Sequence, residues 1–111
     1  MKHYRLEDFT RGWFVGDFSP SIIKTQDVEV AVQRFKSGDQ EAEHCHNIAT
    51  ELTLILSGRV ELGGVEYSDG DIVEIAPGEY AHFRALEDTV TVVVKYPGAP
   101  NDKFLKEGVS D

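Results

Sequence analysis

The chain has 111 residues, a length that fits one domain, and its 11 basic and 20 acidic side chains give a net charge of −9. This balance argues against nucleic acid and anionic lipid as partners, because both repel a negative surface. One cysteine excludes an internal disulfide, no apolar run is long enough to span a membrane, and residues 1–8 lack a signal-peptide core, so we expect a cytoplasmic protein.

Where hydrophobic residues are periodic, their period is mostly two, as in a strand, and not the 3.6 of a helix. The alternating runs cover residues 27–36, 50–57, 59–62 and 89–96. Gly63-Gly64 predicts a two-residue hairpin, and turns are expected at 68–71 and 77–79. Half-buried strands at these intervals predict an all-β sandwich or closed barrel.

The pattern predicts one domain over residues 1–111. Its core barrel is expected at about 27–96, with short edge strands over 1–26 and a polar tail over 97–111. Leu52, Leu54 and Leu56 share one strand face, opposite Glu51. If Glu51 points into the barrel, this stripe points out and needs a cover, either the aromatic N-terminal segment or a second subunit.

The strongest chemical signal lies between residues 40 and 58. Side chains alternate along a strand, so His44 and His46 share one face while Glu41 and Cys45 point the other way. Glu51 has the wrong parity on a continuous strand, so we expect a bend or bulge at 47–50 that turns it toward the histidines. Two imidazoles and a carboxylate form a site for iron, manganese, nickel, zinc or copper.

The spacing Gly38-x5-His44-x-His46-x4-Glu51-x6-Gly58 resembles the first motif of the cupin superfamily. The segment 70–78, which runs Gly-Asp, a short apolar strand and Ala-Pro-Gly, is similar to the start of the second motif. That motif usually places a histidine three residues after its last glycine. Here Ala81 holds that position, and the histidine is His82. Either a bulge near Glu79 restores His82 as a fourth ligand, or the site is His44, His46 and Glu51 alone.

The resemblance implies a double-stranded β-helix, the jelly-roll barrel of small RmlC-like cupins. It also implies one divalent transition metal near the barrel centre, a small-molecule ligand and a homodimer. Tyr80 and Arg84 follow the second motif and are candidates to line the mouth of the pocket. Lys95 lies on the strand face opposite three valines and is a candidate partner for an anionic group.

The resemblance implies no single reaction, and whether the chain is an enzyme is left open. We expect binding of a small polar ligand, sugar-like or carboxylate, at the metal. Isomerisation or epimerisation would use the metal as a Lewis acid together with a general base. The alternatives are a mononuclear iron dioxygenase and a non-catalytic binding module.

Overall fold

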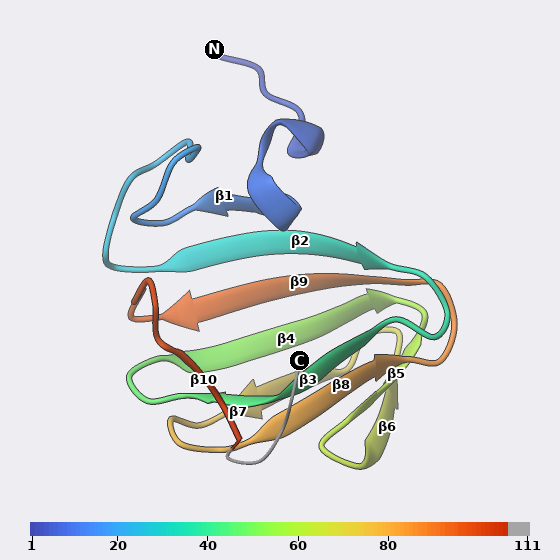
Figure 1. Ribbon diagram of the computed structural model, residues 1–111. Coiled ribbons are helices and arrows are strands. Elements are labelled where there is room, and N and C mark those ends of the chain that lie inside the picture. Colours follow the sequence, from blue (N-terminus) through green and yellow to red (C-terminus); the bar gives the residue numbers. More distant parts are fainter. Residues whose placement is uncertain (107–111) are drawn as a thin grey trace.

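A computed structural model describes residues 1–106 as two antiparallel five-stranded sheets that face each other (Figure 1). Sheet A has the order β1-β2-β9-β4-β7, with bounds β1 Trp13–Val15, β2 Glu29–Phe35, β9 Thr89–Tyr96, β4 Thr50–Ser57 and β7 Ile72–Ile75. Sheet B has the order β10-β3-β8-β5-β6, with bounds β10 Lys103–Leu105, β3 Gln40–His46, β8 Ala81–Ala85, β5 Arg59–Leu62 and β6 Val65–Ser68. Consecutive strands often lie in different sheets, which wraps the chain into a barrel.

The strands form where the two-residue period predicts them. In β9, Thr91 and Val93 are buried between the sheets, while Val92 and Val94 lie on the outer face. The predicted hairpin at Gly63-Gly64 joins β5 and β6. Both glycines have positive φ, 61° and 83°, the left-handed region that a tight hairpin of this kind requires.

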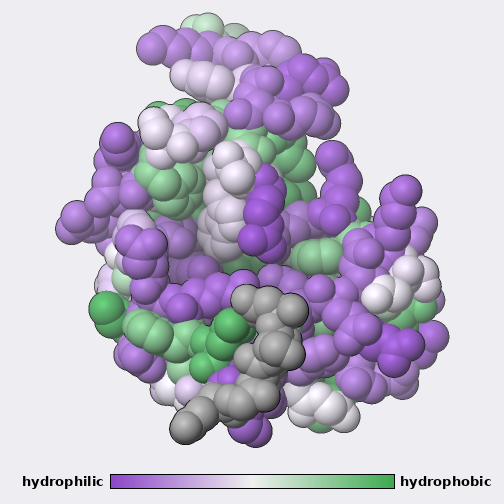
Figure 2. Space-filling model, viewed as in Figure 1, coloured by the Kyte–Doolittle hydropathy of each residue, from purple (hydrophilic) through white to green (hydrophobic). Residues whose placement is uncertain are grey.

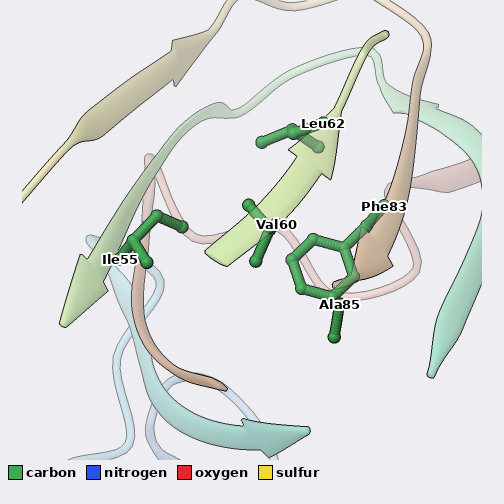
Figure 3. Close-up of a cluster of buried hydrophobic side chains, with 5 residues drawn as sticks. All are labelled: Ile55, Val60, Leu62, Phe83 and Ala85. Carbon is green, nitrogen blue, oxygen red and sulfur yellow. The ribbon is translucent and has the colours of Figure 1, made fainter. Parts of the chain in front are cut away.

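The hydrophobic core fills one end of the barrel. Figure 3 shows its members, contributed by β4, β5 and β8: Ile55, Val60, Leu62, Phe83 and Ala85. Phe35 of β2 closes the gap between the sheets, with its ring centroid 4.6 Å from that of Phe83. The core therefore lies at one end of the barrel, and the remaining interior between the sheets is free to hold polar groups.

The N-terminal segment forms two 3-10 turns, η1 Leu6–Asp8 and η2 Thr10–Gly12, before β1. These elements lie alongside β2 at the edge of sheet A (Figure 1). They leave the leucine stripe of β4 uncovered, since Leu52 and Leu56 are 41% and 55% exposed. Of the two covers considered for this stripe, the N-terminal segment therefore does not cover these two side chains.

The C-terminal segment, which was expected to be a polar tail, includes a strand. Lys103–Leu105 forms β10, which pairs with β3 opposite His44, Cys45 and His46. Residues 107–111 of that predicted tail lie outside the described residues. Neither short helix of residues 1–106 is long or apolar enough to cross a membrane.

Candidate metal and ligand site

Two histidines on β3 face the interior between the sheets. His44 and His46 are two residues apart on one strand, so their side chains project from the same face. Their ring centroids lie 5.3 Å apart with the planes at 85°. His46 is buried and His44 is half-buried. The predicted pairing of the two imidazoles is present.

Backbone carbonyls decide which ring nitrogen of each histidine carries the proton. Nδ1 of His44 lies 2.8 Å from the carbonyl of Ala42, and Nδ1 of His46 lies 2.9 Å from that of Asp102. A carbonyl only accepts, so both Nδ1 atoms donate and each neutral ring keeps a lone pair on Nε2. Burial, aided by nearby Lys103, lowers the pKa of His44 despite the bond to Ala42 and favours this neutral form.

Glu51 reaches the histidines by a change of sheet. The expected bend at 47–50 is a crossover in which β3 ends in sheet B and β4 begins in sheet A. Glu51 Oε1 then lies 3.4 Å from His46 Nε2, and Glu51 Oε2 accepts a 3.0 Å hydrogen bond from the Thr53 hydroxyl. Burial opposes ionisation, but His46, Lys95 and Thr53 outweigh it and lower the pKa of Glu51.

Asp102 holds the crossover and His46 together. Its carboxylate accepts hydrogen bonds of 3.0, 2.9 and 3.0 Å from the backbone N–H groups of Asn47, Ile48 and Ala49. Its carbonyl accepts the bond from His46. Burial raises the pKa of Asp102, but the three N–H donors, with help from His46, outweigh it and bring the pKa below the ordinary value. No sequence motif marked this residue, because it lies 56 positions from His46.

The donor set fits a metal ion. His46 Nε2 is buried and has no hydrogen-bond partner within residues 1–106, because its approach to Glu51 lacks hydrogen-bond geometry. When His46 is neutral, its Nε2 lone pair is directed at this carboxylate, which is unfavourable unless a cation lies between the two groups. In the present side-chain positions no three His, Cys, Asp or Glu groups of the described chain converge on one point. In this arrangement Nδ1 of His44 is held by the carbonyl of Ala42.

His82 does not join the other candidate ligands. In β8, Ala81 lines the cavity and Phe83 and Ala85 are buried, so His82 points to the outer face by alternation. There its Nε2 lies 3.0 Å from Gln40 Oε1. The bulge expected near Glu79 does not turn it inward, so Ala81 occupies the position where the motif usually has a histidine.

The irregularity in this sheet lies in β3 instead. Glu41 pairs with Phe83 and His44 with Ala81, so β3 has one residue more than β8 between these two pairs. This bulge turns Glu41 into the cavity, where it contacts Arg11 at 3.6 Å and Lys103 at 3.9 Å. The expectation that Glu41 points away from the histidines is therefore wrong, since simple alternation fails across a bulge.

A cavity of about 120 Å³ lies beside the candidate ligands. The face shown in Figure 2 is hollowed at its centre, where hydrophilic side chains surround hydrophobic surface. Lys95, predicted as a ligand partner, lines the cavity, and its Nζ lies 4.8 Å from the ring centroid of Trp13. Tyr80 and Arg84 are exposed and are not among the cavity-lining residues.

Sequence reasoning missed several polar residues of the cavity. Thr53 and Thr91 are almost fully buried there, and Thr91 Oγ1 has no hydrogen-bond partner within residues 1–106. Their signal was present in the sequence. Thr53 is two residues from Glu51 and Thr91 is four residues from Lys95, so alternation places each pair on the same face of its strand. Arg11 and Lys103 come from terminal segments, and no local pattern predicts where those segments lie.

Comparison with solved structures identifies the fold. An uncharacterized conserved protein with a double-stranded β-helix domain from Klebsiella pneumoniae matches with a TM-score of 0.70 and 22% identity, covering 96% of this chain and 92% of the other. The DMSP lyase DddQ from Ruegeria pomeroyi matches with a TM-score of 0.72 and 18% identity, covering 94% of this chain and 56% of the lyase. KdgF from a Halomonas species matches with a TM-score of 0.63 and 23% identity over 69% and 74% of the two chains.

The chain has the cupin fold. RmlC-like cupins from Shewanella frigidimarina and Desulfovibrio desulfuricans are also among the similar structures. No protein-family model matches the sequence, and no curated protein matches it. The cupin expectation from the motif spacing is confirmed at the level of the fold, together with the all-β class and the two antiparallel sheets.

Proposed function

We propose that this cupin holds a divalent transition metal with His44, His46 and Glu51 and binds a small carboxylate beside it. The observation that carries the proposal is His46 Nε2, which is buried, has no hydrogen-bond partner in the described chain and lies 3.4 Å from a carboxylate oxygen. The carbonyl of Asp102 holds the proton on the other ring nitrogen, as in many metal-binding histidines. A mixed set of two imidazoles and one carboxylate suits iron, manganese, nickel, zinc or copper.

The charge of the cavity supports an anionic ligand. Three cationic and three carboxylate side chains line it: Arg11, Lys95, Lys103, Glu41, Glu51 and Glu79. These charges cancel at neutral pH, so a bound divalent ion leaves the cavity with a net charge of +2. Although the whole chain carries −9, this interior favours an anion, because interactions are strong where water is largely excluded.

Lys95 is the side chain that would bind the carboxylate. It pairs directly with Glu51 across β9 and β4, so both project to the same inner face. The ring of Trp13 holds its ammonium group by a cation–π contact at 4.8 Å. Arg11 and Lys103 contact Glu41, whereas Lys95 makes no ion pair within residues 1–106. Lys95 is therefore ready to bind a ligand anion next to the metal ligands.

A metal ion bound here supplies Lewis acidity to a ligand oxygen. For isomerisation or epimerisation of a sugar-like acid, the chain must also provide a base. Glu79 lines the cavity, and one of its oxygens accepts a 2.8 Å bond from the N–H of Ala76. Glu79 would take a proton from one carbon of the ligand and return it to the adjacent carbon on the same face, which is an isomerisation. We propose metal-dependent binding of the ligand as the main function, and this proton transfer as the reaction that follows binding.

The volume of about 120 Å³ limits the ligand to a small molecule. We also infer that the chain forms a homodimer, because it exposes large apolar side chains on one sheet face.

Isothermal titration with Mn²⁺, then with glycolate, tests the proposal. Wild type is expected to bind one Mn²⁺ per chain, and glycolate only when the metal is present. The variant Glu51→Gln keeps the shape of the side chain, removes its charge and is expected to bind Mn²⁺ at least tenfold more weakly. His82→Gln is the matched control and should bind like wild type. Equal metal affinity in wild type and Glu51→Gln would contradict the site. Metal analysis of the purified protein identifies the ion, and a preparation without iron would exclude the iron dioxygenase. Glu79→Gln should abolish turnover without weakening Mn²⁺ binding if Glu79 is the base.

A further inference from the structure

The outer face of sheet A is apolar, the reverse of an ordinary sheet with one solvent-facing side. On β2, β9, β4 and β7 its residues alternate with those that line the cavity or core. The strand register places these outward residues in rows across the sheet. One row is Val30, Val94, Leu52 and Glu74, the next is Val32, Val92, Leu54 and Ile72, and the third contains Arg34, Val90 and Ser57, with Leu56 beside them.

This surface is open to solvent in the single chain. Leu52, Leu56 and Ile72 are 41%, 55% and 65% exposed. The N-terminal turns contact β2 at one side and leave β4 and β7 exposed. We call this surface of sheet A the valine–leucine face. A contiguous apolar surface of this kind on a small protein marks an interaction site.

Only two charged side chains lie in these rows, and they have opposite signs. Glu74 is in the first row on β7, and Arg34 is in the third row on β2, so they occupy opposite corners. Strand spacing and rise put them about 20 Å apart along the diagonal. An acid at one corner and a base at the other make the face complementary to itself under a two-fold rotation.

We propose that the valine–leucine face binds the same face of a second copy of this chain. This inference rests on the proposed homodimer and specifies its interface. A two-fold axis in the plane of the interface, perpendicular to the diagonal, places Arg34 of each copy over Glu74 of the other. The same rotation turns the strands of one copy by about 90° to those of the other, which is one of the two common ways in which sheets pack face to face.

The geometry leaves both cavities accessible. The cavity opens on the inner side of sheet A, where Glu51, Thr53 and Lys95 project, whereas the valine–leucine face is on the outer side of the same strands. Arg34 contacts Glu7 at 3.6 Å, and both side chains are more than half exposed. Such an exposed ion pair is weak and can give way to a contact with Glu74 of the second copy.

Charge reversal tests this interface by sedimentation velocity over a range of protein concentrations. Wild type is expected to be a dimer. Arg34→Glu and Glu74→Arg are each expected to raise the dimer dissociation constant at least tenfold, because like charges then meet across the interface. The double variant Arg34→Glu/Glu74→Arg restores opposite charges and should recover most of the wild-type affinity. Arg84→Glu, an exposed charge on sheet B, is the control and should leave the constant unchanged.

Val92→Glu provides a second test at the centre of the face. It is expected to produce monomers that keep the wild-type circular dichroism spectrum and still bind Mn²⁺. A monomeric wild type at 100 μM, a concentration on the order of a weak specific dimer's range, would overturn both the homodimer and the interface. A stable dimer that no reversal weakens would overturn the interface alone. Unchanged Mn²⁺ affinity in Glu51→Gln, together with the expected dimer results, would overturn only the proposed metal site.

Discussion

Two parts of the barrel are built with opposite polarity. Where β5 and β8 of sheet B pair, Val60, Leu62, Phe83 and Ala85 point inward, and charged residues such as Glu61 and Arg84 point outward. Where β4 and β9 of sheet A pair, Glu51, Thr53, Thr91 and Lys95 point inward, and leucines and valines point outward. The first arrangement stabilises a fold in water. The second places polar groups where burial is costly. This reversed polarity is the basis for proposing a ligand site inside and a second subunit outside.

The hydrophobic part of this comparison carries the largest expected effect. Phe83→Ala removes a buried ring that packs against Phe35 at 4.6 Å. The free energy of unfolding should fall by about 3–5 kcal/mol, as is usual for such truncations. Urea denaturation followed by circular dichroism measures it. Phe104→Ala, an exposed aromatic on β10, is the control and should cost far less. Similar losses in the two variants would show that the core is not concentrated around Phe83.

In the polar part, His46→Ala should separate metal binding from folding. The affinity for Mn²⁺ is expected to fall at least a hundredfold, about 2.7 kcal/mol or more, because the most buried nitrogen donor is lost. The apo protein should keep its β-sheet spectrum, because the variant removes one side-chain hydrogen bond, from Nδ1 to the carbonyl of Asp102, and leaves the strand pairing intact. Titration calorimetry measures the affinity, and His3→Ala is the control outside the barrel. An unchanged affinity would show that His46 is not a ligand.

Asp102 links stability to the site, and Asp102→Ala should affect both. Three N–H groups, of which that of Ala49 is buried, lose their acceptor, so the free energy of unfolding is expected to fall by about 2–4 kcal/mol. Metal affinity should also fall about tenfold, because the backbone that orients His46 loosens. Asp102→Asn keeps one acceptor oxygen and should recover part of each loss. The tautomer of His46, read from ¹⁵N chemical shifts of the apo protein, should become mixed in Asp102→Ala. A purely structural role would leave it unchanged.

Lys95→Met should weaken the binding of glycolate to the Mn²⁺-loaded protein about tenfold, since one charged contact is removed and the aliphatic shape is kept. Metal affinity should not fall, because the variant removes a cation beside Glu51. Lys36→Met, an exposed lysine outside the cavity, is the matched control. Equal glycolate affinity in the two variants would place the carboxylate elsewhere in the cavity.

The smallest expected effect is a dependence of stability on pH. The pKa of Asp102 lies below its ordinary value of 3.8 in the folded chain. Its carboxylate therefore stabilises the fold fully above the unfolded pKa, and this contribution disappears as the pH falls through the folded pKa. The stability difference between wild type and Asp102→Asn should be constant from pH 7 to about 5 and shrink below about pH 4. Urea titrations at several pH values measure it, and a difference that grows toward low pH would contradict this assignment.

Much of this molecule follows from local patterns in the sequence. Alternation predicts the strands, Gly63-Gly64 predicts the hairpin, and the spacing of two histidines puts them on one face. These predictions succeed because strand geometry depends only on neighbouring residues. The inward direction of Ala81 was also readable, since Phe83 and Ala85 continue its alternation in β8.

Other features depend on where distant segments meet. The sequence implied that Glu51 must turn toward the histidines, but only the tertiary structure shows that a crossover between two sheets does this. It also decides that Asp102 holds His46 and that a bulge turns Glu41 inward. The same holds for the leucines of β4, which lie on an uncovered face. Hydrophobic periodicity determines that the two faces of a strand differ in polarity, and which residues lie on each face. It does not determine what lies against each face, because that depends on contacts between residues far apart in the chain.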